Sequence, residues 1–192
     1  MDQNESAVYS LIKQQNLDAI ILPTATFSNF MDKNELRSWI EKFSNVPIVS
    51  LGMDISEFTD NQSSILINNN TGLETLILHL INDHKYTEIA YIGGTDGNVD
   101  ATERLATFKK CLAITNTPFK EEYFYQGQFC YQDGIDCVTQ FLDVRKVKPQ
   151  VIVCANDSNA LGVIDELERR GIKVPDEIAV TGFDNSKESD FV

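Results

Sequence analysis

A chain of 192 residues, 42% of them hydrophobic, is long enough to bury a core as one domain or as two small lobes. Its formal charge of −13 argues against nucleic acid or an anionic membrane as a direct partner of this chain, because both require a cationic face. No apolar stretch approaches the roughly 18 residues of a membrane span, and acidic, polar sequence follows Met1 where a signal peptide would be apolar.

Short apolar runs alternate with amphipathic stretches along the whole chain. For example, Leu36, Trp39, Ile40 and Phe43 follow the i, i+3, i+4, i+7 spacing of a helix that buries one face. The predicted helices cover residues 7–15, 34–43, 73–81, 103–112, 134–143 and 159–171. The predicted strands cover residues 17–24, 46–52, 63–70, 88–94, 150–157 and 177–185.

This alternation predicts an α/β fold in which helices flank parallel sheets. The strands read as continuous apolar runs, which is typical of strands buried on both faces. A shift in composition at residues 116–128, "NTPFKEEYFYQGQ", predicts a boundary between an N-terminal lobe of residues 1–120 and a C-terminal lobe of residues 121–192. Ligands of such sheets bind beyond the carboxyl ends of the strands, where this chain places several polar residues.

The cysteines Cys111, Cys130, Cys137 and Cys154 form no CxxC pair and no zinc-ligand spacing. Cys154 lies inside an apolar run, as a small buried hydrophobic residue does. We therefore expect a reduced, cytoplasmic protein with no metal site and no cofactor. The sequence also contains no GxSxG, HExxH or GxxxxGK[ST] motif, and we expect no enzymatic activity.

Residues 154–185, "CANDSNALGVIDELERRGIKVPDEIAVTGFDN", resemble the effector-binding core of the LacI/GalR repressor family. The resemblance extends upstream through "NVPIVSLG", "INNNTGLETLILHLINDHKYTEIAYIGG" and "DATERLATFKKCL", in the family's order. It implies a periplasmic-binding-protein-like fold of type I, with two lobes and a ligand cleft. The family's helix-turn-helix, first strands and final strands have no counterpart here, so we expect two lobes that are truncated at both ends.

The resemblance also implies a set of ligand contacts. Arg104 matches an arginine that reaches into the cleft; the alternative is a solvent-facing arginine paired with Glu103 or a neighbouring acid. Asp184 matches an aspartate that accepts hydrogen bonds from the ligand; the alternative is a residue that only closes an Asx turn. Phe129 matches an aromatic residue that stacks on a sugar or base, with core packing as the alternative.

Asn156 matches an asparagine that contacts the ligand, but an asparagine after a strand also caps the next helix. We assign that capping role mainly to Asp157. Thr24, Asp96 and Asn98 lie on predicted cleft-side loops and are weaker candidate contacts.

Taken with the resemblance, these residues predict a sugar- or nucleoside-sensing effector domain of a LacI/GalR-like transcriptional regulator. Parts of the sequence, "HLINDHKYTEIAYIGG" and "DATERLATFKK", also resemble modules fused to diguanylate cyclases or histidine kinases. The alternative is a periplasmic sugar-binding protein of a transport system, against which the cysteines and the missing signal peptide argue. The expected partners are a small-molecule effector and a second copy of the chain. DNA would be contacted only through a domain outside this chain, and no membrane partner is expected.

Overall fold

The computed structural model describes residues 17–27, 31–43 and 45–191. The chain divides into two compact units, which we call unit 1 (residues 1–67) and unit 2 (residues 68–192). Each unit contains one parallel sheet with helices packed against it, so the predicted α/β class is confirmed. The helix predicted over residues 7–15 lies outside the described residues.

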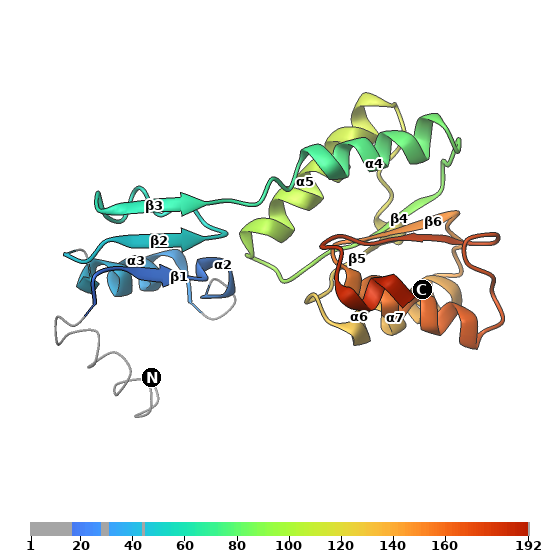
Figure 1. Ribbon diagram of the computed structural model, residues 1–192. Helices are drawn as coiled ribbons and strands as arrows, with labels where there is room; N and C mark the ends of the chain where they lie inside the picture. Colours follow the sequence, from blue (N-terminus) through green and yellow to red (C-terminus); the bar gives the residue numbers. More distant parts are fainter. Residues whose placement is uncertain (1–16, 28–30, 44, 192) are drawn as a thin grey trace. The chain divides into compact units, whose positions relative to one another are not determined.

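Unit 1 is built on a three-stranded parallel sheet in the order β1-β2-β3. Its strands are β1 (Ile20–Leu22), β2 (Ile48–Leu51) and β3 (Gln62–Ile65). The helices are α2 (Thr24–Phe27), α3 (Lys33–Ile40) and the short 3₁₀ helix η1 (Glu41–Phe43). Helix α3 lies along one side of the sheet (Figure 1).

The predicted apolar face of α3 forms the core of unit 1. Asp32 caps the helix by accepting hydrogen bonds from the backbone N–H groups of its first turn. Leu36, Trp39, Ile40 and Phe43 are buried against the sheet. On the opposite side of the sheet, Ile21 and Ile65 are 68% and 61% exposed.

Unit 2 contains a four-stranded parallel sheet in the order β5-β4-β6-β7. Its strands are β4 (Ile89–Ile92), β5 (Phe124–Tyr125), β6 (Val151–Cys154) and β7 (Ala179–Thr181). Its longer helices are α4 (Thr71–Asn82), α5 (Val99–Ile114), α6 (Tyr131–Thr139), which continues into the π-helical turn η3 (Gln140–Val144), and α7 (Asp157–Arg169). The 3₁₀ helices η2 (Glu121–Tyr123) and η4 (Lys187–Phe191) complete it.

The central strands of unit 2 are covered on both faces. Side chains of Ala90 and Ile152 pack toward α6 and α7, whereas those of Tyr91 and Val153 pack toward α4 and α5. Figure 1 shows the first helix pair on one side of these strands and the second pair on the other. Burial on both faces is the physical reason for the continuous apolar runs in the sequence.

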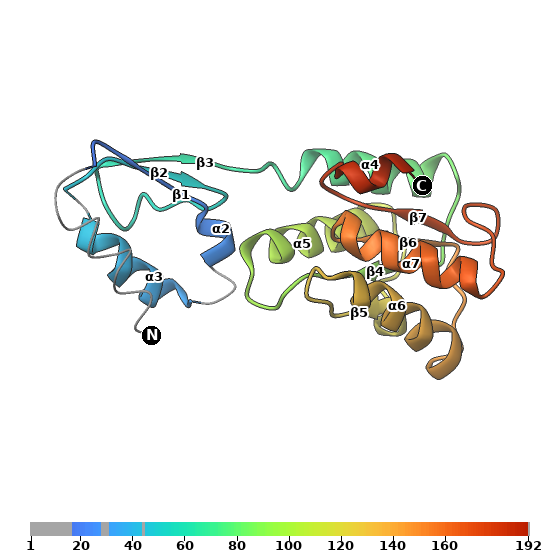
Figure 2. The same ribbon diagram turned by 60° about the horizontal axis from the view of Figure 1, so that its bottom comes forward.

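Helices α6 and α7 approach each other through two glycines. A Cβ atom at Gly162 would lie 2.0 Å from the carbonyl oxygen of Tyr131, and one at Gly134 would lie 2.3 Å from that of Asn159. Only hydrogen fits at either position. The close contact holds the start of α7 beside the start of α6, seen from a second direction in Figure 2.

The two units differ from the lobes predicted at residues 1–120 and 121–192. Strands β4 and β5 lie on either side of that boundary in sequence, yet they pair with each other in one sheet. The observed division falls between Ile67 and Asn68. The polar stretch at residues 116–128 contains edge strand β5, whose two residues are only partly buried, whereas the central strands β4 and β6 are fully buried.

Candidate functional site

The carboxyl ends of the unit 2 strands bring together four of the residues predicted from the sequence. Phe129 follows β5, Asn156 follows β6 and Asp184 follows β7, while Arg104 reaches the same edge from α5. We call these four residues the strand-end cluster. The cluster lies entirely in unit 2, whereas the predicted lobes would have drawn Arg104 from one lobe and the others from the second or the crossing region.

Arg104 is 4% exposed and its guanidinium is held from several sides. Nε donates to Oδ1 of Asn69 at 2.9 Å, and Nη1 donates to the carbonyl oxygen of Ala155 at 2.5 Å. The guanidinium carbon lies 3.7 Å from the ring centre of Phe183 and 5.8 Å from that of Phe129. The alternative of a solvent-facing arginine is therefore wrong.

The carboxylate of Asp184 faces this guanidinium. Oδ1 lies 3.9 Å from Nη2 of Arg104, and the aspartate side chain is 48% exposed. Among the described residues, none donates a hydrogen bond to this carboxylate. Partial burial raises the pKa of Asp184 above its usual value, while the charge of Arg104 opposes that shift. The carboxylate thus retains its capacity to accept hydrogen bonds from a bound molecule.

Two of the three strand-end loops that carry the cluster contain residues with positive φ. Phe129 has φ of 65°, Asp184 108° and Asn185 56°. Such a backbone is uncommon for residues other than glycine, and for a bulky side chain it marks a conformation imposed by the surroundings. The ring of Phe129 lies directly over Gly94, where a Cβ atom would come within 2.1 Å of the ring.

Asn156 caps helix α7, because its Oδ1 accepts a hydrogen bond from the backbone N–H of Asn159 at 2.9 Å. Its Nδ2 donates to the carbonyl oxygen of Phe129 at 3.0 Å. The capping role that the sequence assigned mainly to Asp157 therefore belongs to Asn156. Asp157 instead holds the loop after β7, because its Oδ2 accepts from the backbone N–H of Ser186 at 2.7 Å.

The weaker candidates lie elsewhere. Asn98 is buried and caps α5 by accepting from the backbone N–H of Ala101 at 3.0 Å. Thr24 belongs to unit 1, where its buried hydroxyl lies 2.6 Å from that of Ser50 and donates to the carbonyl oxygen of Leu51 at 3.0 Å. The hydroxyl of Thr24 is thus engaged within unit 1.

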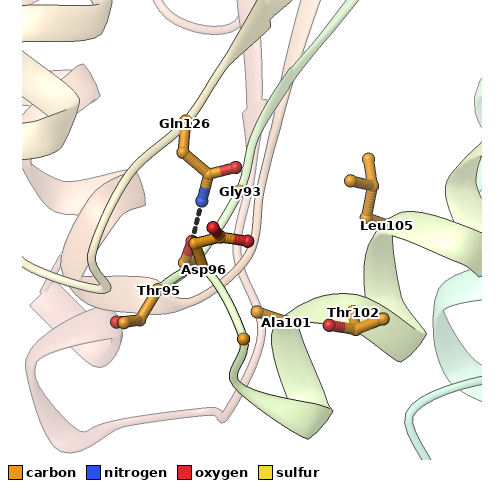
Figure 3. Close-up of a pocket in the computed structure, with 9 residues that line it drawn as sticks. Gly93, Thr95, Asp96, Ala101, Thr102, Leu105 and Gln126 are labelled. Atoms are coloured by element: carbon orange, nitrogen blue, oxygen red, sulfur yellow. Dashed lines mark hydrogen bonds between the residues drawn. The ribbon is translucent and has the colours of Figure 1, made fainter. Parts of the chain in front are cut away.

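Asp96 lines a small pocket beside the loop after β4 (Figure 3). The pocket has a volume of about 40 Å³ and is closed on one side by Gln126, whose amide donates to the carbonyl oxygen of Gly94. Thr102 and Leu105 line the α5 side. A volume of this size accommodates a few water molecules.

Two residues at the site were not among the individual ligand contacts predicted from the sequence. Phe183 stacks on Arg104, and Asn69, which is 1% exposed, accepts the hydrogen bond from its Nε. Three asparagines end the strand predicted over residues 63–70, but periodicity gives no signal for which of them is buried. Phe183 read as the last apolar residue of a strand.

His79 and His84 lie at the exposed end of α4 and in the turn that follows it. Nδ1 of His79 is 2.6 Å from Oδ2 of Asp83, and the two Nε2 atoms are 3.0 Å apart. In the part of the chain that the structure describes, no group of three or more histidine, cysteine, aspartate and glutamate side chains could hold a metal ion. No helix of the same part is both long and apolar enough to cross a membrane.

Known protein families and sequences resemble this chain. The family model of periplasmic binding protein-like domains matches residues 77–192, which include the whole strand-end cluster. The chain belongs to this family. Similar sequences include the HTH-type transcriptional repressor PurR of Mannheimia succiniciproducens, which is 29% identical over 181 residues. The PurR repressor of Actinobacillus pleuropneumoniae serotype 3 is 31% identical over 179 residues. These matches cover 94% and 93% of this chain, and 52% of each repressor.

Solved structures of the family agree. A sugar-binding transcriptional regulator of the LacI family from Escherichia coli, in complex with phosphate, matches 99% of this chain and 65% of its own with a TM-score of 0.80 at 25% identity. The Escherichia coli transcriptional repressor AscG matches 98% of this chain and 65% of its own with a TM-score of 0.76 at 25% identity. The predicted resemblance to LacI-family effector-binding cores is confirmed. The chain spans about half the length of the curated relatives it matches.

Proposed function

We propose that this chain is the effector-binding part of a LacI-type transcriptional regulator, and that unit 2 contacts a sugar or nucleoside at its strand-end cluster. One observation carries the proposal. The guanidinium of Arg104 is buried and fixed, and its Nη2 faces the half-exposed carboxylate of Asp184 at 3.9 Å. A donor and an acceptor therefore lie side by side at the edge of the sheet where ligands of α/β proteins bind.

The chemistry of the cluster suits a neutral polyhydroxylated ligand. Nη2 carries two N–H groups, and among the described residues neither has a hydrogen-bond partner within the chain. The carboxylate of Asp184 accepts from hydroxyl or ring N–H groups. Vicinal hydroxyls present the matching acceptor and donor, and the half-buried ring of Phe129 offers an apolar face beside them.

The role in regulation rests on the relatives. The matched proteins are named as transcriptional repressors and regulators, which favours a regulator over a transport protein and a binding role over a catalytic one. We propose a cytoplasmic homodimer in which DNA is contacted through a domain outside this chain. An effector would act by its difference in affinity between two conformations of the protein.

A thermal-shift screen followed by calorimetric titration tests the proposal. Sugars, nucleosides, amino acids and inorganic phosphate are added to the chain, to an Arg104→Lys variant and to a matched Arg37→Lys control. Arg37, in helix α3 of unit 1, forms an exposed ion pair with Glu41. Because lysine keeps the charge but loses the planar fork, we expect Arg104→Lys to abolish the response and Arg37→Lys to retain it. Stabilisation by amino acids alone, or an unchanged response in Arg104→Lys, would contradict the proposal.

A further inference from the structure

We infer that Asn69 is a positioning residue that holds the Arg104 guanidinium ready for a ligand and keeps two neighbouring carboxylates from pairing with it. The inference deepens the proposed function, since it rests on Arg104 as the ligand contact. Asn69 lies in the segment before α4, and Arg104 lies 35 residues later in α5. The structure brings the two side chains together in the interior of unit 2.

The amide of Asn69 has only one workable orientation. Its Oδ1 accepts from Nε of Arg104 at 2.9 Å, whereas its Nδ2 donates to Oδ1 of Asp100 at 2.7 Å and to Oε2 of Glu103 at 2.9 Å. Exchanging the amide nitrogen and oxygen would turn the oxygen toward two carboxylates and the NH₂ group toward a cation. The two acids therefore fix the amide, and the amide fixes the arginine.

Three contacts then determine the plane of the guanidinium. Asn69 holds Nε, the carbonyl oxygen of Ala155 holds Nη1, and the ring of Phe183 covers one face at 3.7 Å. The remaining nitrogen, Nη2, is directed toward Asp184. An arginine side chain has many rotamers, so a guanidinium fixed in advance loses less conformational entropy when a ligand binds.

Asn69 also separates charges. Asp100 lies one helical turn before Arg104 on α5, and Glu103 lies next to it. Both carboxylates are engaged by the neutral amide and not by the guanidinium in this structure. Without the amide, an ion pair between Arg104 and either acid would satisfy the arginine within the chain and leave less of its hydrogen-bonding capacity for a ligand.

The neighbouring Asn70 supplies a matched control. Its Oδ1 accepts from the hydroxyl of Thr107, so it also joins the start of α4 to α5, but among the described residues it forms no hydrogen bond with Arg104. Replacing Asn70 by alanine removes a comparable bridge between the same two helices. A merely structural role of the asparagine run would make the two substitutions equivalent.

The test follows the Nε–H proton of Arg104 by ¹⁵N-resolved NMR in the unliganded chain, with the signal assigned by its disappearance in Arg104→Lys. We expect this proton to exchange with water at least about tenfold faster in Asn69→Ala, as loss of a hydrogen bond worth roughly 1.4 kcal/mol would cause. In Asn70→Ala the rate should be unchanged. Equal rates in Asn69→Ala and the unmodified chain would overturn the inference.

A measurement on the unmodified chain keeps the test decisive if Asn69→Ala fails to fold. The Nε–H of Arg104 should exchange at least about tenfold more slowly than that of Arg37, whose side chain is 52% exposed. Comparable rates would also overturn the inference. These exchange measurements involve no ligand. If the exchange rate of the Arg104 Nε–H proton depends on Asn69 while the ligand response is unaltered in Arg104→Lys, the positioning role is upheld and only the proposed function is refuted.

Discussion

The side-chain amide of Asn156 connects two strand-end loops by using both of its ends. Oδ1 caps α7 through the backbone N–H of Asn159 at 2.9 Å, and Nδ2 donates to the carbonyl oxygen of Phe129 at 3.0 Å. Phe129 has a positive φ, which the second hydrogen bond helps to maintain. One residue thus stabilises a helix and shapes the loop that presents an aromatic ring at the strand-end cluster.

Two substitutions separate these roles of Asn156. Asn156→Asp keeps an acceptor for the cap and removes the donor to Phe129, whereas Asn156→Ala removes both. We expect Asn156→Ala to lower the free energy of unfolding by about 0.5–2 kcal/mol more than Asn156→Asp does, because only alanine loses the cap. Urea unfolding followed by circular dichroism measures the difference. Equal stability of the two variants would show that the cap contributes little.

Replacing Asp184 with alanine should abolish the ligand response and leave the fold nearly intact. In the described part of the chain the carboxylate accepts no hydrogen bond and is 48% exposed, so we expect its loss to affect the folded state only slightly. Loss of a hydrogen bond between a charged group and a ligand costs about 1.5–3 kcal/mol, roughly 10- to 150-fold in affinity. Calorimetric titration beside a melting curve checks both effects. An unchanged affinity with a clearly lower melting temperature would assign Asp184 to the turn alone.

Ligand binding should weaken on acidification sooner than an ordinary aspartate would allow. Partial burial raises the pKa of Asp184, so its carboxylate gains a proton at a higher pH and loses its charge as an acceptor. The same shift means that Asp184 favours folding at low pH and loses that contribution as the pH rises through its folded-state pKa. Titrations across the acidic range, compared with Asp184→Asn, test this. A pH dependence of the same size in Asp184→Asn would locate the titrating group elsewhere.

Glu166 should contribute stability that disappears only in strong acid. It is 4% exposed, and hydrogen bonds from Arg169 at 2.6 Å and Arg170 at 2.7 Å lower its pKa to about 2. A lowered folded-state pKa stabilises the protein above the unfolded value of 4.5, and this contribution is lost as the pH falls toward about 2. Glu166→Gln should therefore be less stable by about 1.5–3 kcal/mol at neutral pH. Denaturant unfolding in both pH ranges should show the gap closing in acid.

Alanine substitutions at two helical glycines, Gly162 in α7 and Gly72 in α4, should change stability in opposite directions. Gly162→Ala would place a Cβ atom 2.0 Å from the carbonyl oxygen of Tyr131. Helices α6 and α7 must then separate, and the free energy of unfolding should fall by about 1–3 kcal/mol. Gly72→Ala in α4 meets no atom within 4 Å and should raise stability by up to about 1 kcal/mol, since alanine favours the helix. Melting temperatures of the two variants check the signs. A neutral Gly162→Ala would mean that the helices can move apart at little cost.

The local hydrophobic pattern of the sequence predicts many of the strands and helices, but it does not predict how the chain divides into units. The apolar runs predicted β4 and β6 and the spacing of Leu36, Trp39 and Ile40 predicted α3, because burial of a repeating face is a local property. Which strands pair is decided by contacts between distant segments. Strand β4 pairs with β5 across the predicted lobe boundary, and nothing in the composition of residues 116–128 distinguishes a linker from an edge strand.

The cluster itself was predictable because parallel strands end at one edge of a sheet. That rule, together with the family resemblance, brought forward Arg104, Phe129, Asn156 and Asp184. The choice of Asn156 over Asp157 as the cap of α7 was not predictable, because either residue type caps a helix and the choice depends on a loop 27 residues away in sequence. The contacts of Asn69 depend likewise on the packing of α4 against α5.

Trp39 is the only tryptophan of the chain and is buried in the core of unit 1, 4.9 Å from the ring of Phe43. The tyrosines of the described residues all lie in unit 2: Tyr86, Tyr91, Tyr123, Tyr125 and Tyr131. Within the described residues, unit 1 therefore carries the tryptophan and unit 2 carries the tyrosines. Fluorescence excited at the red edge of the tryptophan absorption band reports on unit 1 alone, so a single unlabelled sample reveals whether the two units unfold together. A change in the emission wavelength of Trp39 on effector binding would be a direct optical signal that unit 1 responds to events at Arg104.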